Sequence, residues 1–113
     1  MSRKPVDAAE QMFERVVGAT TGPDIHETTM FGCRTLLVGN KMVACLYHGD
    51  LAVRLGRTDP VYDTALALRG SKLWDPTRRE RPFRDWVLVS GQESERWVEL
   101  AGVAVLRARV AAD

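Results

Sequence analysis

The stretch between Met30 and Gly56 constrains the fold of this chain most. Apolar residues alternate in it with polar or small ones, and two turn signals interrupt the alternation, Gly39-Asn40 and His48-Gly49-Asp50. A period of two places successive side chains on opposite faces of a strand, and Gly-Asn favours a two-residue hairpin turn. The stretch predicts three consecutive antiparallel strands: 33–38, 41–47 and 51–55.

The turns also predict the register of these strands. Two-residue turns at Gly39-Asn40 and Gly49-Asp50 predict four facing pairs: Val38 with Lys41, Leu36 with Val43, Leu46 with Val53, and Ala44 with Leu55. One sheet face then carries Cys33, Thr35, Leu37, Met42, Ala44, Leu46, Leu51, Val53 and Leu55. The other carries Arg34, Leu36, Val38, Lys41, Val43, Cys45, Tyr47, Ala52 and Arg54. The first face is nearly all apolar, so we expect helices to cover it, and the second is mixed.

The same register predicts the state of the chain's two cysteines. It directs Cys33 and Cys45 to opposite faces, which excludes a disulfide or a shared metal site. A slip of one residue would bring them to one face, but as diagonal neighbours rather than a facing pair. We therefore expect two free thiols, with Cys33 buried in the core and Cys45 partly covered.

The rest of the chain alternates helical and extended patterns. An apolar stripe from Val6 to Val17 predicts a first helix, with Asp7 as its N-cap and an end near Gly18 to Gly22. Asp59 followed by Pro60 predicts the start of a second helix, which ends at Gly70. A third helix is expected from Ser94 to about Ala111. Two further strands are expected: one over 72–74, the other from 84 or 85 to 90.

These elements predict one α+β domain spanning residues 1–113, with a core over about 6–110. The expected order is α-β-β-β-α-β-β-α, with a single antiparallel five-stranded sheet and helices mainly on one face. The length of 113 residues suits one domain, and 45% apolar with 27% charged residues is an ordinary globular composition.

Charge and hydropathy limit the partners and the cellular location that we expect for the chain. The formal net charge is +1, which gives no global attraction to nucleic acid or to a membrane. No apolar run approaches the roughly 20 residues of a membrane-spanning helix, and the N-terminal residues lack the apolar core of a secretory signal. We expect a cytoplasmic protein with no membrane association.

The segment "MFGCRTLLVGNKMVACLYHGDLAVRL" and the later "LWDPTRRERPFRDWVLV" resemble the N-terminal domain of the TfoX/Sxy competence-regulator family. The shared features are a Met-Phe-Gly entry to the first of the three strands, a Gly-Asn-Lys hairpin and a "GDLAVRL" strand. The likeness covers about residues 12–106. It implies a fold similar to that of secretion chaperones and a non-catalytic regulatory role, without catalytic residues or a cofactor. The second, helical domain of the two-domain relatives has no counterpart in these 113 residues.

The residues themselves also favour a non-enzymatic function. Catalysis by a cysteine or serine requires a nearby base, and the only two imidazoles are His26 and His48, one in a loop and one in a turn. No CxxC, HxxxH or clustered carboxylates suggest a metal site. We expect no catalytic residues, no metal ligands and no cofactor.

An arginine-rich segment is the most distinctive charged feature: Arg78, Arg79, Arg81 and Arg84. Arginines bind phosphate through two hydrogen bonds, and the nearby Phe83 and Trp86 could stack on bases. The alternative is a solvated loop, since Glu80 and Asp85 lie among the arginines, with both aromatic residues as core anchors. The segment predicts a nucleic-acid or other anionic partner as one of two candidate functions.

The other candidate function is that of a regulatory or protein-interaction domain. For such a domain we expect self-association. A homodimer is expected through the mixed sheet face, at Leu36, Val38, Val43 and Tyr47. That apolar band would be larger than a monomer normally leaves exposed. If the C-terminal helix covers this face instead, the chain would be a monomer.

Overall fold

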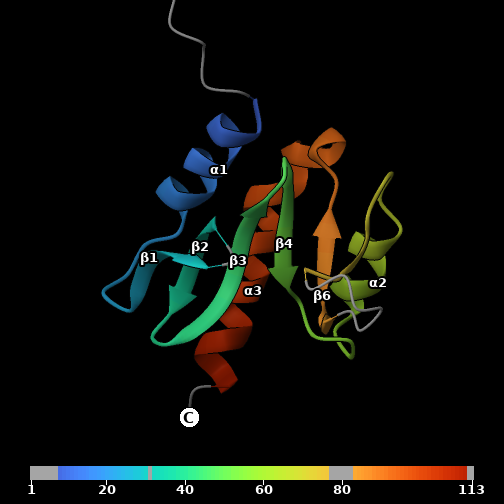
Figure 1. Ribbon diagram of the computed structural model, residues 1–113. Coiled ribbons are helices and arrows are strands. Elements are labelled where there is room, and N and C mark those ends of the chain that lie inside the picture. Colours follow the sequence, from blue (N-terminus) through green and yellow to red (C-terminus); the bar gives the residue numbers. More distant parts are fainter. Residues whose placement is uncertain (1–7, 31, 77–82, 112–113) are drawn as a thin grey trace, which may run out of the picture.

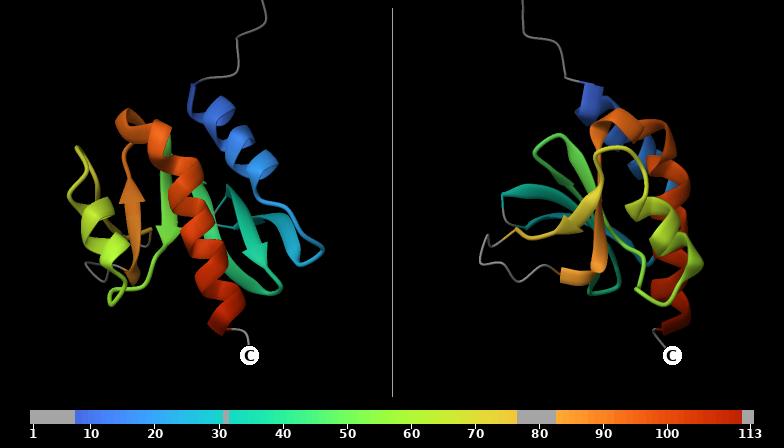
Figure 2. Two further views of the ribbon diagram at one scale, coloured as in Figure 1. Left: turned by 180° about the vertical axis from the view of Figure 1, so that it is seen from behind. Right: turned by 90° about the vertical axis from the view of Figure 1, so that its right-hand side faces the viewer.

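The computed structural model describes residues 8–30, 32–76 and 83–111. One antiparallel sheet has six strands in the order β1-β2-β3-β4-β6-β5, and the helices lie on one of its faces (Figures 1 and 2). Its elements are α1 (Ala8–Ala19), β1 (Ile25–Met30), β2 (Cys33–Val38), β3 (Lys41–Tyr47), β4 (Asp50–Arg54), α2 (Pro60–Leu66), β5 (Lys72–Trp74), β6 (Phe83–Val89), the 3₁₀ helix η1 (Gly91–Arg96) and α3 (Trp97–Ala111). The expected α+β class with a single antiparallel sheet is confirmed.

The expected number of five strands is wrong, because the sequence "IHETTM" forms the edge strand β1. Five of its six residues are exposed, so it has no buried face and no apolar alternation to reveal it. It pairs with β2 from Ile25 opposite Val38 to Met30 opposite Cys33.

None of the helices in the described part of the chain is long and apolar enough to cross a membrane.

The first hairpin contains a β-bulge at Val43. Val38 faces Lys41 as expected, but Leu36 faces Ala44 rather than Val43, since the register shifts between Leu36 and Leu37. Val43 is the extra residue on β3, and such a residue bends its strand. The expected pair of Leu36 and Val43 is therefore wrong.

The second hairpin turns one residue earlier than expected. Leu46 faces Leu51 and Tyr47 faces Asp50, so the turn consists of His48 and Gly49. Both have a positive φ, 50° for His48 and 85° for Gly49, as a type I′ turn requires. The expected pairs of Leu46 with Val53 and Ala44 with Leu55 are wrong by two residues. Because a shift of two keeps each side chain on its face, Leu46 and Val53 still belong to the helix-covered core.

The bulge changes which residues of β2 and β3 lie under the helices. Leu36, Val38 and Val43, expected on a mixed outer face, are buried in the core with residues of all three α-helices. This removes most of the expected dimer face, and only Tyr47 belongs to the opposite side of the sheet. The structure thus matches the alternative in which the C-terminal helix covers these residues.

A second, smaller hydrophobic cluster lies on the face of the sheet opposite the helices. Its buried members are Cys45, Ala52, Trp74, Trp86 and Leu88, with Cys33, Met42, Tyr47 and Phe83 at its margin. The placement of the two cysteines on opposite faces is therefore wrong. They lie on one face as diagonal neighbours, since Thr35 and not Cys33 faces Cys45. Both thiols are free.

Of the predicted helix starts, that of α2 is confirmed and that of α3 is shifted, whereas Asp7, the expected N-cap of the first helix, lies outside the described residues. Asp59 is the N-cap of α2 and its Oδ1 accepts a hydrogen bond of 2.8 Å from the backbone N–H of Val61. Ser94, the expected start of the last helix, lies in η1, and α3 begins at Trp97. The indole N–H of Trp97 donates to the carbonyl of Ser90 at 3.3 Å, which ties the start of α3 to the end of β6.

Candidate functional site

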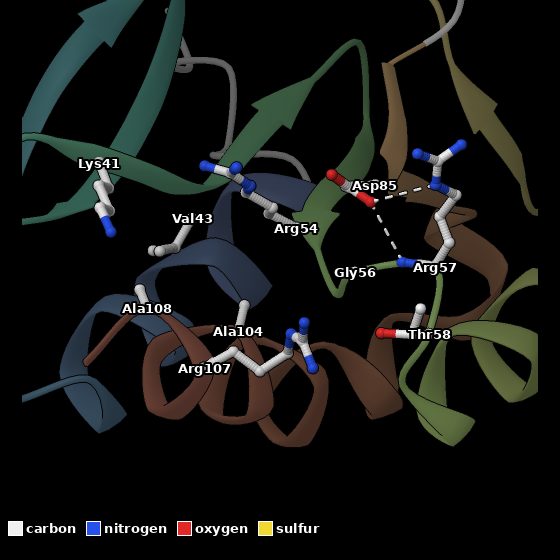
Figure 3. Close-up of a pocket in the computed structure, with 10 residues that line it drawn as sticks. All are labelled: Lys41, Val43, Arg54, Gly56, Arg57, Thr58, Asp85, Ala104, Arg107 and Ala108. Atoms are coloured by element: carbon white, nitrogen blue, oxygen red, sulfur yellow. Dashed lines mark hydrogen bonds and ion pairs between the residues drawn. The ribbon is translucent and has the colours of Figure 1, made fainter. Parts of the chain in front are cut away.

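A cavity of about 260 Å³ opens where the start of β3 separates from the end of β4, above α3 (Figure 3). The two strands pair from Tyr47 with Asp50 to Ala44 with Val53, and the bulge at Val43 ends the pairing there. The cavity is lined by Lys41, Val43, Arg54, Gly56, Arg57, Thr58, Asp85, Ala104, Arg107 and Ala108. Its position thus follows from the irregularity of the first hairpin.

Four cationic side chains from four separate segments line this cavity. They are Lys41 of β3, Arg54 of β4, Arg57 in the connection to α2, and Arg107 of α3. Lys41 points from the sheet toward α3 and Arg107 extends from α3 on the other side, whereas the guanidinium groups of Arg54 and Arg57 point away from α3 (Figure 3). Asp85 is the only carboxylate among the lining residues. Like charges concentrated around one concave surface create a strongly positive local potential despite a net charge near zero. We call this cavity, with its ten lining residues, the basic pocket.

Asp85 fixes the connection that follows β4. Its backbone carbonyl accepts hydrogen bonds from the N–H groups of Leu55, at 3.0 Å, and Gly56, at 2.9 Å. Its carboxylate accepts the backbone N–H of Arg57 at 3.2 Å and lies 3.7 Å from the Arg57 guanidinium. The single acidic lining residue therefore has a structural role, and its negative charge offsets Arg57 more than the other three cations.

The position of Arg107 depends on Asp59, which binds its guanidinium, and on Gly56, which leaves space for it. Its Nη1 donates to Oδ2 of Asp59 at 3.0 Å, so the cap residue of α2 also orients this arginine. A Cβ at position 56 would collide with the Arg107 guanidinium. Gly56 also has φ of 81°, a conformation that other residues rarely adopt. The positive φ requires glycine here, and the absence of a side chain leaves the space that the Arg107 guanidinium occupies at the cavity wall.

The floor of the cavity is apolar. Ala104 and Ala108 lie one turn apart on α3 and face Val43 of the sheet (Figure 3). Small side chains at these two positions leave room between helix and sheet. An apolar floor with a cationic rim suits a small ligand that carries a phosphate or carboxylate group, because arginine can bind either with two parallel hydrogen bonds.

The sequence did not predict this site, because its charges come from segments far apart in the chain. Lys41 and Arg54 were expected on the same sheet face, but Lys41 pairs with Val38 of the helix-covered face and Arg54 pairs with Trp86 of the opposite face. Of the predicted binding residues, Arg78, Arg79 and Arg81 lie outside the described residues. Arg84 is an exposed residue of β6 next to Asp85, and its carbonyl accepts a hydrogen bond of 2.7 Å from Tyr62.

A second cavity brings together two residues that were considered for nucleophilic catalysis. Cys33 and His48 both line a space of about 270 Å³ with Glu10 and Arg34. Arg34 binds three carboxylates there, those of Glu10 at 3.2 Å, Glu14 at 2.8 Å and Glu27 at 2.7 Å. Within residues 8–30, 32–76 and 83–111, no cluster of three or more His, Cys, Asp or Glu side chains could hold a metal ion.

Comparison with known proteins adds no identification to this geometry. No protein-family model, no curated protein and no solved structure matches the chain.

Proposed function

We propose that this chain is a non-catalytic regulatory domain that acts by binding an anionic ligand in the basic pocket. The observation that carries the proposal is that Lys41, Arg54, Arg57 and Arg107 line one cavity that has a single carboxylate in its lining. The resemblance to the TfoX N-terminal domain supports the regulatory role. The charge pattern supports the binding role.

The ligand class follows from the size and lining of the cavity. A volume of about 260 Å³ is small for an organic ligand, and the apolar area is limited to one valine and two alanines. A phosphate or carboxylate group with a short carbon skeleton would match both features. Its charge would lie between Lys41, Arg54 and Arg107, and its carbon atoms would contact Ala104 and Ala108.

Binding of small anions to the purified chain tests this proposal. Inorganic phosphate, a short phosphomonoester and citrate would each be titrated while the amide NMR signals are recorded. We expect saturable shifts that map to residues 41–43, 54–58 and 104–108. Arg54→Gln and Arg107→Gln should each weaken binding roughly tenfold, the loss of about one charge-assisted hydrogen bond of 1.4 kcal/mol.

The control is Arg15→Gln, which removes an equally exposed positive charge from α1, outside the lining of the pocket. It should bind anions as the unmodified chain does. If Arg15→Gln weakened binding as much as Arg54→Gln, the effect would reflect net charge alone and the proposed pocket would be wrong. Absence of saturable shifts for all three anions would also contradict the proposal.

Nucleic acid is the second candidate ligand, and the position of Arg84 favours it. Arg84 is exposed and directly precedes Asp85 of the pocket, so a phosphate backbone could extend from the pocket along the start of β6. Titration with a short single-stranded oligonucleotide separates the two candidates. Oligonucleotide binding that weakens steeply with salt and depends on Arg84 as well as Arg54 would favour nucleic acid over a small anion.

A further inference from the structure

The outer side of α3 presents an apolar surface that the chain itself does not cover. Gly102, Leu106 and Val110 are exposed on this side, and Val103 lies at its edge, where it also packs against the core. We call these four residues the outer face of α3. Leu106 is 62% exposed and Val110 75%, and Val103 is half-buried. In the left view of Figure 2, α3 runs in front of the sheet. Large exposed apolar side chains side by side on one helix indicate an interaction surface.

Gly102 is the least expected residue of this face. It lies in the interior of a long helix, where glycine is less favourable than almost any other residue. A Cβ added to it would meet no atom within 4 Å, so packing inside the chain does not require glycine here. A residue without a side chain at an exposed helical position allows another backbone or side chain to approach closely.

We infer that the outer face of α3 binds the same face of a second copy of this chain, with the two helices antiparallel about a two-fold axis. In this arrangement Leu106 of each copy fills the space above the partner's Gly102. Gly102 and Leu106 are four residues apart and lie in one row along the helix, so a single register satisfies both contacts at once.

The charges on α3 support the same register. Glu99 precedes Gly102 by three residues and Arg109 follows Leu106 by three residues. When Leu106 faces the partner's Gly102, Glu99 therefore faces the partner's Arg109. A parallel arrangement would instead place like charges together. The antiparallel one also aligns the two helix dipoles favourably.

Glu99 and Arg109 each have an oppositely charged partner within the chain, and these partners lengthen the row of charges that two copies would share. Glu99 pairs with Arg96 at 2.8 Å and Arg109 with Asp24 at 2.9 Å. Across the two-fold axis, these residues would form an alternating row of Arg96, Glu99, the partner's Arg109 and the partner's Asp24. The face is thus complementary to itself in both shape and charge, which favours a second copy over an unrelated helix.

The interface would be small. It consists of one pair of helices, whereas a stable complex typically buries about 1,600 Å² in total. We therefore expect a weak dimer whose population depends on protein concentration. The inference is independent of the proposed anion site, because none of the four residues of the outer face lines the basic pocket.

Sedimentation equilibrium of the full chain from micromolar to millimolar concentration tests the inference. We expect a monomer–dimer equilibrium, and both Gly102→Gln and Leu106→Gln should weaken it at least about tenfold. Gly18→Gln is the matched control, because Gly18 is also an exposed helical glycine with open space around it, but in α1. This control should dimerise like the unmodified chain.

Thermal unfolding at micromolar concentration separates a lost contact from a lost fold. Gln is a better helix former than Gly, so Gly102→Gln should unfold at a higher temperature than the unmodified chain while dimerising less. An unmodified chain that stays monomeric up to millimolar concentration would overturn the inference. Dimerisation of Gly102→Gln as strong as that of the unmodified chain would overturn it equally.

Discussion

The guanidinium of Arg107 lies directly over Gly56, in the space that any side chain at position 56 would occupy. This contact joins the end of β4 to α3 and fixes one wall of the basic pocket. Gly56→Ala should therefore act in two ways. It should lower the free energy of unfolding by about 1–3 kcal/mol, because alanine at φ of 81° is strained. It should also displace Arg107 and weaken phosphate binding.

Gly49→Ala is the control that separates strain from displacement. Gly49 has nearly the same φ, 85°, but a Cβ there would meet no atom within 4 Å. Chemical denaturation should show a similar loss of stability for both variants, whereas phosphate titration should show weaker binding only for Gly56→Ala. Equal phosphate affinity in the two variants would mean that Arg107 does not contribute to the site.

Burial makes the Cys45 thiol a pH-sensitive contributor to stability. The side chain is fully buried, and this desolvation raises its pKa from the ordinary value of 9.0 to about 11. The folded state therefore favours the protonated thiol. Its contribution is fully present below pH 9.0 and is lost as the pH rises through 11, an effect of about 3 kcal/mol.

Comparison with Cys45→Ala isolates this effect. The difference in unfolding free energy between the unmodified chain and Cys45→Ala should shrink by about 2 kcal/mol between roughly pH 8 and pH 11, because the variant has no thiol to ionise. Denaturant unfolding at several pH values measures it. A difference that stays constant over this range would show that Cys45 does not titrate with folding.

The two thiols should also react at different rates in the folded chain. Cys33 is partly exposed and Cys45 is fully buried, although both lie on the same sheet face. A thiol reagent should modify Cys33 first and Cys45 only through opening of the sheet. In denaturant without reductant, the reagent should count two thiols. Mass spectrometry of partly modified protein identifies the order, and equal rates would contradict the burial of Cys45.

The sequence predicted the fold well where the local signals are strong. The cap formed by Asp59 and Pro60 and the turn at Gly39 identified α2 and the first hairpin. The prediction failed at β1, because a strand exposed along nearly its whole length has no periodic apolar pattern. It also failed at Val43, since a bulge leaves no mark in an alternating sequence and yet exchanges the two faces beyond it.

The candidate site lies beside the bulge at Val43, which the sequence did not predict, and the site was therefore missed as well. Lys41 and Arg107 are separated by more than half of the chain, and only the packing of α3 against the sheet brings them to one cavity. Val43, the bulged residue of β3, lines that cavity just beyond the last pair of β3 with β4. A sequence can show that an arginine is present, but not which long-range packing places it beside another cation.

Arg34 connects α1 to the sheet, and its removal should destabilise that contact. Its guanidinium binds Glu10, Glu14 and Glu27 and lies 5.0 Å from the centre of the Phe13 ring. Arg34→Met should lower the free energy of unfolding by about 1 kcal/mol, since the network is partly exposed and leaves three carboxylates unneutralised. Arg96→Met, which removes an exposed pair with Glu99, should have less than about half of that effect.

Salt provides the second test of this network. Added salt should reduce the difference between Arg34→Met and the unmodified chain, because screening weakens both the attraction to Arg34 and the repulsion among the carboxylates. Urea unfolding at low and high ionic strength measures the change. A loss of stability that does not depend on salt would assign the role of Arg34 to its contact with Phe13 instead.

Asp59 combines two roles that substitution can separate. Its Oδ1 caps α2 through the N–H of Val61, and its Oδ2 holds Arg107 at 3.0 Å. Asp59→Asn preserves a capping oxygen but removes the negative charge beside the basic pocket. We expect it to raise the affinity for phosphate severalfold, since Arg107 no longer shares its charge with a carboxylate, while stability changes little.

Asp59→Ala removes the cap as well as the charge. It should lower the free energy of unfolding by about 0.5–2 kcal/mol, the usual loss for an N-cap. Its phosphate affinity should still exceed that of the unmodified chain as long as α2 stays folded. Calorimetric titration with phosphate measures both variants beside Arg107→Gln. If Asp59→Asn bound phosphate more weakly, the orientation of Arg107 by Asp59 would matter more for the ligand than the competition for its charge, and the expected direction would be wrong.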